Sequence, residues 1–160
     1  MMELVRAEEH HLPAIGKLWW EFMLFHQAVD TWFTPREGSV PHFLEHHVSK
    51  FMHSDNGLVL VAIENGTVVG YSLSEIQGPS PATKQDKWGY IDQMAVTESY
   101  RRRGVGEKMY TEIMAWFEFK GVCRVELELT ARNYISYSFW RKHGFKDYMH
   151  RLYLERSVKG

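Results

Sequence analysis

The chain has 160 residues, of which 44% are hydrophobic and 14% aromatic, and its formal net charge is −1. This length and composition suit one compact domain over residues 1–160 with a single core. Because the charges nearly balance, the sequence has no domain-wide basic face of the kind that nucleic-acid-binding domains carry. No run approaches the roughly 18 apolar residues of a membrane span, and the N-terminus has no hydrophobic signal segment. We therefore expect neither a nucleic acid nor a membrane as a partner.

Cys123 is the single cysteine of the chain, so it cannot form an internal disulfide. A lone thiol indicates a reducing compartment, and we expect a cytoplasmic protein. Cys123 falls in a segment where apolar and charged residues alternate, which favours a buried structural thiol over a nucleophile.

The first half of the chain predicts a strand, two helices and a β-hairpin. Apolar residues recur at helical spacing from Leu12 to Val29, which indicates a long amphipathic helix. Pro41 opens a second helix, with Ser39 as a candidate cap, because proline is favoured in the first helical turn. Asn65-Gly66 tolerates the positive φ angles of a two-residue hairpin turn. The expected elements are a strand at 3–6, helices at 12–29 and from 41 to 52, and hairpin strands at 58–64 and 67–76.

The second half predicts strands and helices in alternation. The expected elements are a strand at 88–96, a helix at 105–120, a strand at 122–130, a helix from Asn133 to His143 and a final strand at 145–155. The order β-α-α-β-β-β-α-β-α-β implies an α/β fold, with a central mixed sheet flanked by helices on both faces. Exposed edge strands of such a sheet are compatible with a homodimer.

A basic, glycine-containing turn joins a predicted strand to a predicted helix. Its residues are Arg101, Arg102, Arg103, Gly104, Val105 and Gly106. The two glycines let the backbone come close to a ligand, and the free N–H groups that open a helix point at an anion. Arginine adds charge and can grip phosphate oxygens through two donors. The turn predicts a phosphate site, although three basic residues can also be a solvated face or a nucleic-acid patch.

A second motif runs from Asn133 to Phe145 and reads N-Y-I-S-Y-S-F-W-R-K-H-G-F. It is similar to N-x-x-A-x-x-F-Y-x-K-x-G-F, and the basic turn reads R-x-x-G-x-G. Together the two motifs resemble those of the GCN5-related N-acetyltransferase (GNAT) family, and the element order matches the family's layout over essentially the whole chain. The sequence departs from the pattern at Ser136, where alanine is usual, and at Trp140, where many members carry a tyrosine.

The resemblance implies a site for acetyl-CoA, the cosubstrate of the family. The pantetheine arm would lie along the backbone of Met94, Ala95 and Val96. The pyrophosphate would lie on the turn from Arg102 through Arg103, Gly104, Val105 and Gly106 to Glu107, and Arg101 before it would also bind the cosubstrate. Asn133 would hold the arm from the other side.

Three carboxylates are candidates for the general base that acetyl transfer to an amine needs. Asp92 lies where similar diamine and aminoglycoside acetyltransferases place a carboxylate, and strand alternation predicts that it shares a face with Met94 while Gln93 points away. Glu128 matches the carboxylate position of the ribosomal-protein Nα-acetyltransferases, and Glu75 lies on the long third strand. Each can also be a solvent-facing strand residue.

Trp140 bears on the other proton, the one that the departing thiolate takes up. An indole N–H donates a hydrogen bond but does not titrate as a phenol does. Tyr137, one helical turn earlier, or water could supply that proton, while Trp140 packs against the sheet or hydrogen-bonds the sulfur. His42 and His46 have the i, i+4 spacing of a zinc site, but without a third ligand nearby we expect a surface pair and no metal.

The sequence therefore predicts an acetyl-CoA-dependent N-acetyltransferase that acts on a primary amine. We expect a small amine of the polyamine, aminoglycoside or amino-acid type. A protein N-terminus is one alternative acceptor, and a domain that binds acetyl-CoA without turnover is the other alternative.

Overall fold

The computed structural model describes residues 1–158, and the chain divides into two compact units, Met1–Glu128 and Leu129–Gly160. Among the described residues, the first unit holds the sheet and four α-helices, and the second holds one α-helix. The single domain over residues 1–160 stays a prediction. Within the described residues, no helix is long and apolar enough to cross a membrane.

The first unit is built on a mixed sheet with the strand order β1-β2-β3-β4-β5. The strands are β1 Met2–Arg6, β2 Gly57–Glu64, β3 Thr67–Gln77, β4 Trp88–Val96 and β5 Val125–Leu127. Strands β1 to β4 pair antiparallel in sequence order, and β5 pairs parallel to β4. Asn65 and Gly66 have φ angles of 49° and 77°, which confirms the predicted hairpin turn between β2 and β3.

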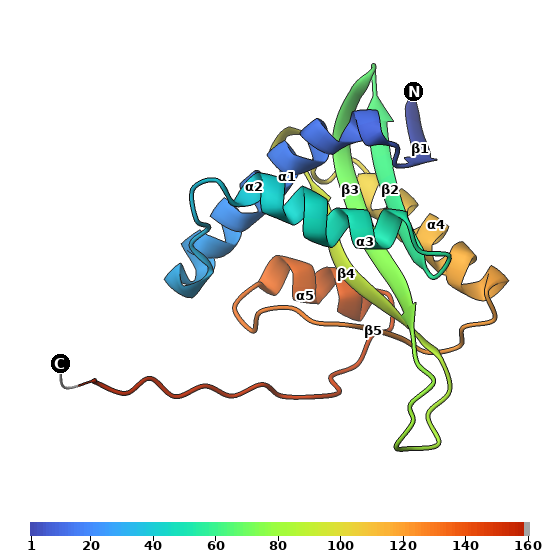
Figure 1. Ribbon diagram of the computed structural model, residues 1–160. Coiled ribbons are helices and arrows are strands. Elements are labelled where there is room, and N and C mark those ends of the chain that lie inside the picture. The colour runs from blue at the N-terminus through green and yellow to red at the C-terminus, as the bar shows by residue number, and fades with distance from the viewer. Residues whose placement is uncertain (159–160) are drawn as a thin grey trace. The chain divides into compact units, whose positions relative to one another are not determined.

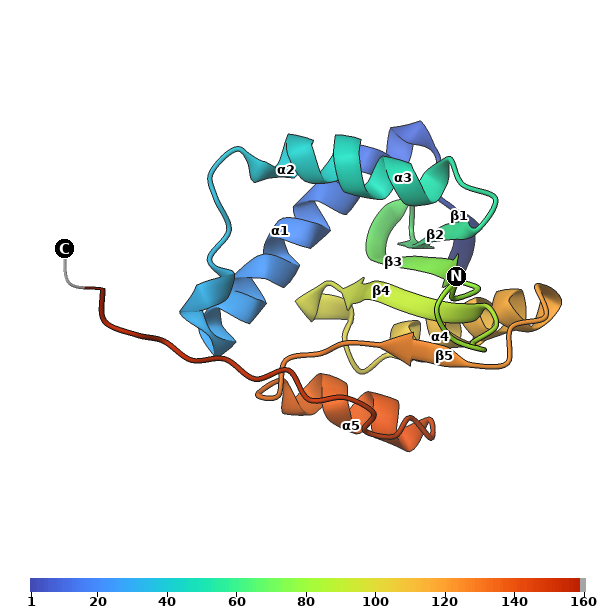
Figure 2. The ribbon, with the colours of Figure 1, turned by 60° about the horizontal axis from the view of Figure 1, so that its bottom comes forward.

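Helices cover both faces of this sheet, as predicted (Figure 1, Figure 2). The helices of the first unit are α1 Leu12–Val29, α2 Ser39–His42, α3 Ser49–Met52 and α4 Val105–Phe119. Figure 2 shows α1, α2 and α3 on one side of the strands and α4 on the other. The mixed sheet flanked by helices is therefore confirmed within the first unit.

The predicted second helix differs from expectation at its start and in its middle. It begins at Ser39, and its N-cap is Gly38, whose φ of 74° is left-handed. Ser39 is not the cap, because its Oγ donates a hydrogen bond to the carbonyl oxygen of Arg36 at 2.7 Å. Between α2 and α3, residues Phe43–Val48 form a π-helical turn. Such turns are rare in proteins, and those that occur are often found at functional sites.

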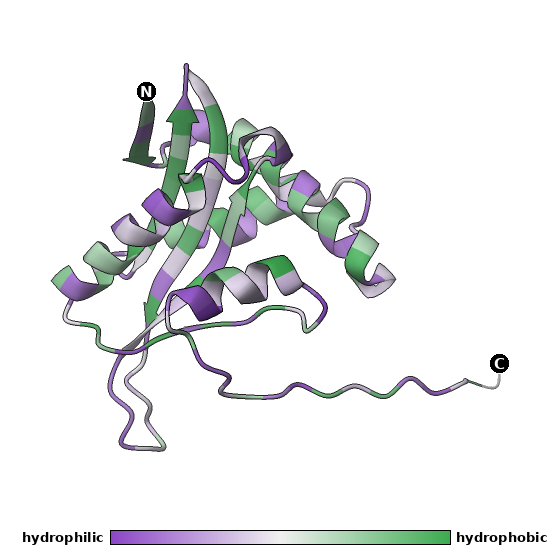
Figure 3. Cartoon of the chain, turned by 180° about the vertical axis from the view of Figure 1, so that it is seen from behind, coloured by the Kyte–Doolittle hydropathy of each residue, from purple (hydrophilic) through white to green (hydrophobic). Residues whose placement is uncertain are grey.

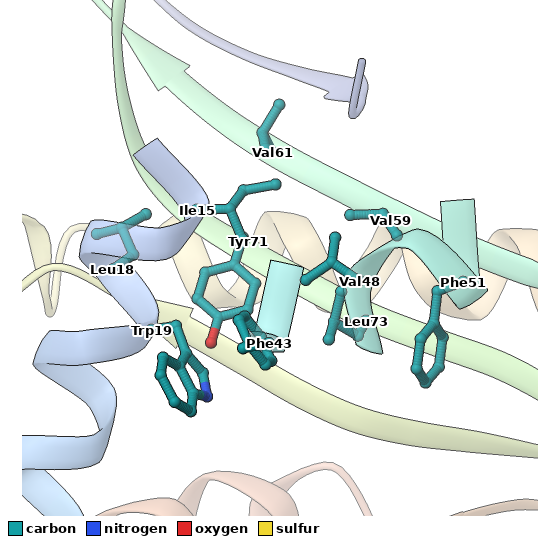
Figure 4. Packing of buried hydrophobic residues seen from close by; sticks show 10 residues of the cluster. All are labelled: Ile15, Leu18, Trp19, Phe43, Val48, Phe51, Val59, Val61, Tyr71 and Leu73. Carbon is teal, nitrogen blue, oxygen red and sulfur yellow. The ribbon is translucent and has the colours of Figure 1, made fainter. Parts of the chain in front are cut away.

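The main core lies between α1–α3 and the sheet (Figure 4). Its buried members are Ile15, Leu18, Trp19, Phe43, Val48, Phe51, Val59, Val61, Tyr71 and Leu73. The rings of Trp19 and Phe43 stack with centroids 4.3 Å apart, which joins α1 to the π-helical turn. A second cluster of Ala62, Val69, Val105 and Met109 packs α4 on the opposite face. Figure 3 shows hydrophobic residues following the central strands between the two helix layers.

The second unit contains α5 Tyr134–Lys142, and both predicted ends of this helix are confirmed. The Asn133 side chain accepts a hydrogen bond from the Ser136 N–H at 3.1 Å, as an N-cap does. Gly144 follows the helix with a φ of 91°.

Two strand predictions in this part of the chain were wrong. The strand expected at 122–130 is shorter, Val125–Leu127, and the strand expected at 145–155 is absent from the described residues. A strand forms only where a neighbouring strand pairs with its backbone N–H and C=O groups. Alternating apolar and charged side chains favour a strand but do not supply that neighbour. Residues 129–158 contain no strand that could pair with 145–155. Cys123 consequently lies before β5 and is exposed, so the predicted buried thiol was also wrong.

Candidate active site

A β-bulge in β4 places Asp92 outside the regular ladder with β3. Leu73 lies opposite Gln93 and Ser74 lies opposite Ile91, so Asp92 is the additional residue on β4. A bulge interrupts the side-chain alternation of a strand. The side chains of Asp92 and Gln93 therefore both lie on the face of the sheet that α1–α3 cover, where they make the hydrogen bonds described below.

Met94 packs against the cluster under α4 on the opposite face. The prediction that Asp92 shares a face with Met94 while Gln93 points away was therefore wrong. Simple strand alternation does not allow for a bulge.

Asp92 pairs with a histidine that the sequence did not point out as functional. His47 Nε2 lies 2.7 Å from Asp92 Oδ2, and the two side chains are 40% and 22% exposed. The imidazole lies between the rings of Phe43 and Phe51, with centroid distances of 5.5 and 5.2 Å. A partly exposed carboxylate–imidazole pair can accept a proton from a bound amine.

The π-helical turn explains why His47 was missed. In the sequence, His47 fits the inner face of a regular helix beside core residues, which predicts a packing role. His47 lies inside the π-helical turn Phe43–Val48. Its hydrogen-bond partner, Asp92 on β4, is 45 residues away in sequence. The sequence offered one hint of a functional histidine, namely that His47 lies between Phe43 and Phe51.

Gln93 has its own partner on β3. The hydroxyl of Tyr71 donates a hydrogen bond to Gln93 Oε1 at 2.7 Å, and Tyr71 is fully buried. Burial raises the pKa of the Tyr71 phenol well above its usual value, and the nearby charge of Asp92 raises it further. Tyr71 therefore stays protonated and remains a hydrogen-bond donor to Gln93.

The other two predicted carboxylates lie in different surroundings. Glu75 Oε1 accepts a hydrogen bond from Gln77 Nε2 at 2.7 Å, and Glu75 pairs with Tyr90 in the ladder. Glu128 is exposed, follows the end of β5 and is the last residue of the first unit. Asp92 is the predicted carboxylate that the structure joins to an imidazole.

The ladder between β4 and β5 ends just before the bulge. It covers Gly89 to Ile91 on β4, whereas the ladder with β3 continues to Val96. Met94, Ala95 and Val96 therefore have a strand neighbour on one side only, among the residues that the structure describes. The pantetheine arm needs such an open strand edge, and its placement along Met94 to Val96 stays a prediction.

The turn between β4 and α4 has the backbone of an anion site. Gly104 is the N-cap of α4 with a φ of 81°, and as a glycine it has no side chain to cap this helix end. The first intrahelical bond runs from the Lys108 N–H to the Gly104 carbonyl oxygen at 3.1 Å. A Cβ on Gly104 would meet no atom of the described residues within 4 Å. This open approach to a helix N-terminus suits a pyrophosphate.

The three arginines of the turn have different environments. Arg101 Nε donates to the Val96 carbonyl oxygen at 3.0 Å, and its guanidinium lies 5.4 Å from the Phe25 ring centre. Arg103 lies over the Tyr100 ring at 5.1 Å. Arg102 is exposed and has a left-handed φ of 60°. Arg101 is thus held against α1, whereas Arg102 lies at the exposed bend of the turn.

Glu21 on α1 joins the same turn and was not predicted. Its carboxylate accepts hydrogen bonds from Thr97 Oγ1 at 2.9 Å and from the Glu98 N–H at 2.8 Å. Its Oε1 also lies 3.8 Å from an Arg101 guanidinium nitrogen. These contacts fix the start of the β4–α4 turn on α1. A single acid within an amphipathic helix gives no sequence signal for this role.

The remaining predicted residues lie together in the second unit. Trp140 Nε1 donates to Ser136 Oγ at 3.2 Å, and the Trp140 ring lies 5.2 Å from that of Phe145. The Tyr137 hydroxyl donates to Asp147 Oδ1 at 3.1 Å. The serine that replaces the usual alanine is therefore the hydrogen-bond partner of the tryptophan that replaces the usual tyrosine.

Comparison with known proteins connects this geometry to a family. The acetyltransferase (GNAT) family matches residues 15–145. The chain belongs to this family. Acetyltransferases of this family use acetyl-CoA as the acetyl donor.

Individual relatives agree with the assignment. An N-alpha-acetyltransferase of Sulfurisphaera tokodaii is 34% identical over 92 residues, which are 54% of this chain and 55% of that protein. The match thus spans about half the length of this relative. A crystal structure of a mutant protein from Bacillus halodurans has a TM-score of 0.83 at 18% identity and covers 97% of this chain and 99% of its own. An aminoglycoside N-acetyltransferase in complex with CoA has a TM-score of 0.74 at 16% identity, covering 99% and 96%. These two structures share the fold.

Proposed function

We propose that this domain transfers the acetyl group of acetyl-CoA to a primary amine, and that Asp92 and His47 together accept the amine's proton. The contact of 2.7 Å between Asp92 Oδ2 and His47 Nε2 carries this proposal. The pair lies at the bulge, directly before the strand residues that we assign to the pantetheine arm. An acid–imidazole pair in this position can keep a bound amine neutral.

The reaction needs one bond made, one bond broken and two proton movements. The neutral amine nitrogen attacks the thioester carbonyl carbon, and the C–N bond forms as the C–S bond breaks. The amine proton passes to the Asp92–His47 pair. The departing thiolate takes a proton from water, since an ordinary thiol has a pKa near 8.5 and its thiolate is only a moderately poor leaving group. Tyr137 is the side-chain alternative for this last step.

Acetyl-CoA would be held by backbone more than by side chains. Met94, Ala95 and Val96 supply the open strand edge, and Gly104 to Glu107 supply the start of α4. Arg102 and Arg103 would add positive charge to the turn. Arg101, which is held against α1, would add a further positive charge. The start of α4 and the open space beside Gly104 fit a phosphate group.

We propose a small amine as the acceptor and a protein N-terminus as the second candidate. The relative named as an N-alpha-acetyltransferase supports the second candidate, and the aminoglycoside acetyltransferase with the same fold supports the first. The loop after α1 carries Trp32, which is 81% exposed, beside Asp30. An aromatic ring and an acid at this place would suit a cationic amine.

Thiol release from acetyl-CoA tests the proposed function directly. The protein is incubated with acetyl-CoA and a panel of polyamines, aminoglycosides, amino-acid amides and short peptides, while free CoA is measured. We expect amine-dependent release with at least one class. If calorimetry detects bound acetyl-CoA but no amine gives release, the domain binds the cosubstrate without turnover and the proposal is wrong.

A further inference from the structure

The pair of Tyr71 and Gln93 lies next to Asp92 and takes no part in the proton transfer proposed above. Tyr71 is completely buried in the main core, and its hydroxyl donates to Gln93 Oε1 at 2.7 Å. A buried phenol needs a hydrogen-bond partner, because an unpaired polar group in the core destabilises the fold. The pairing therefore fixes the orientation of the Gln93 amide.

The fixed orientation determines what Gln93 can offer to a ligand. A side-chain amide has one acceptor oxygen and two N–H donors. Since Tyr71 occupies the oxygen, Gln93 Nε2 provides the donors on the other side of the amide. Gln93 is partly exposed, so part of its side chain is open to a bound molecule.

The bulge places this donor beside the proposed proton acceptor. Asp92 and Gln93 are consecutive, their Cα atoms are about 3.8 Å apart, and both side chains bond to residues on the α1–α3 side of the sheet. In a regular strand, two consecutive side chains point to opposite faces. A ligand at this bulge therefore meets a carboxylate and an amide N–H donor close together.

We infer that Gln93 Nε2 donates a hydrogen bond to a carbonyl oxygen of the acceptor, and that the acceptor is an α-amino carbonyl compound of the amide or peptide type. This inference rests on the proposed function and narrows its acceptor. In such a compound one carbon separates the amine from the carbonyl group. The amine would face the Asp92 carboxylate, and the carbonyl oxygen would face the neighbouring Gln93 amide. A free amino acid is disfavoured, because its carboxylate would meet the negative charge of Asp92.

Two matched amines test this assignment. Leucinamide and isopentylamine share their alkyl chain and their amine, but only leucinamide has the carbonyl group. We expect the unmodified protein to prefer leucinamide. Gln93→Leu should lower kcat/KM for leucinamide by at least about tenfold, equal to about 1.4 kcal/mol of barrier. The value for isopentylamine should stay within about twofold.

A second variant addresses the orientation of the amide. Tyr71→Phe keeps Gln93 but removes the phenol that fixes it, so the preference for leucinamide should fall by less than in Gln93→Leu. Calorimetry of acetyl-CoA binding serves as the control for folding in both variants, and unchanged affinity is expected.

The outcomes separate this inference from the proposed function. Equal losses for both amines in Gln93→Leu would place Gln93 on the acetyl group and overturn the inference, while acetyl transfer itself would stand. Unchanged kcat/KM for both amines would also overturn it. Absence of turnover with every amine, in protein that binds acetyl-CoA, would overturn the proposed function and this inference with it.

Discussion

The two halves of β4 have different tasks, although they are one continuous strand. Trp88 to Ile91 pairs with β3 on one side, and its last three residues pair with β5 on the other. Asp92 to Val96 starts with a bulge and continues with β3 as its only ladder partner among the described residues. This second half holds Asp92, which we assign to proton transfer with His47, and Met94, Ala95 and Val96, which we assign to the pantetheine arm. Regular pairing stabilises the first half, whereas the second half carries the side chains and backbone groups that we assign to ligand binding.

Asp92→Asn should have the largest effect on this comparison. The amide keeps the shape of the side chain and its hydrogen bond with His47, but it cannot accept a proton at neutral pH. Turnover should fall by roughly ten- to ten-thousandfold, the usual span for one general base, with acetyl-CoA affinity retained. Steady-state kinetics of the matched variants Glu75→Gln and Glu128→Gln should show little loss. A larger loss in either of those two would move the role to that carboxylate.

Gly104→Val should weaken acetyl-CoA binding by at least about a hundredfold, or about 2.7 kcal/mol. The branched side chain would project at the helix end where we place the pyrophosphate. Gly38→Val is the matched control, because Gly38 also has a left-handed φ and caps a helix, and a Cβ added there would likewise meet no described atom within 4 Å. Both variants should lose similar stability. If calorimetry gave the same acetyl-CoA affinity for Gly104→Val and Gly38→Val, the assignment of the β4–α4 turn to the pyrophosphate would be wrong.

Gly89→Ala tests the paired half of β4. A Cβ on Gly89 would lie 2.6 Å from a ring carbon of Phe117, which is fully buried. Overpacking of this kind costs about 1–3 kcal/mol of folding stability. We expect urea unfolding to show this loss while kcat at low temperature stays unchanged. If Gly89→Ala kept native stability but had a lower kcat, the paired half of β4 would serve catalysis, contrary to our account.

Tyr137→Phe should have the smallest effect, less than about tenfold in turnover. The Tyr137 hydroxyl already donates to Asp147 at 3.1 Å, and water can protonate the thiolate. Trp140→Phe should likewise keep measurable transfer. Single-turnover kinetics with bound acetyl-CoA check both variants. A loss of more than about tenfold, equal to about 1.4 kcal/mol, would instead make Tyr137 the acid.

Local signals in the sequence predicted most of the first unit. The helical spacing from Leu12 to Val29, the Asn65-Gly66 turn and the glycine before α4 each act within a few residues, and each was confirmed as structure. The π-helical middle of the second helix, Phe43–Val48, was not predicted, because the spacing of apolar residues there also fits a regular α-helix.

The candidate site was predictable only in part. Asp92 and the β4–α4 turn carry recognisable motifs, and their roles stay predictions. His47, Glu21 and Tyr71 act through partners that are 45, 76 or 77, and 22 residues away in sequence. Such pairs have no periodicity to detect, and the bulge at Asp92 depends on the register between two strands.

The most direct test of the account is a double-mutant cycle with Asp92→Asn and His47→Gln. If the two side chains act as one proton acceptor, their effects on kcat/KM are not independent. The double variant should then be within about threefold of the slower single variant. Losses that multiply in the double variant would mean that Asp92 and His47 act separately, and would contradict the proposed shared role at the bulge.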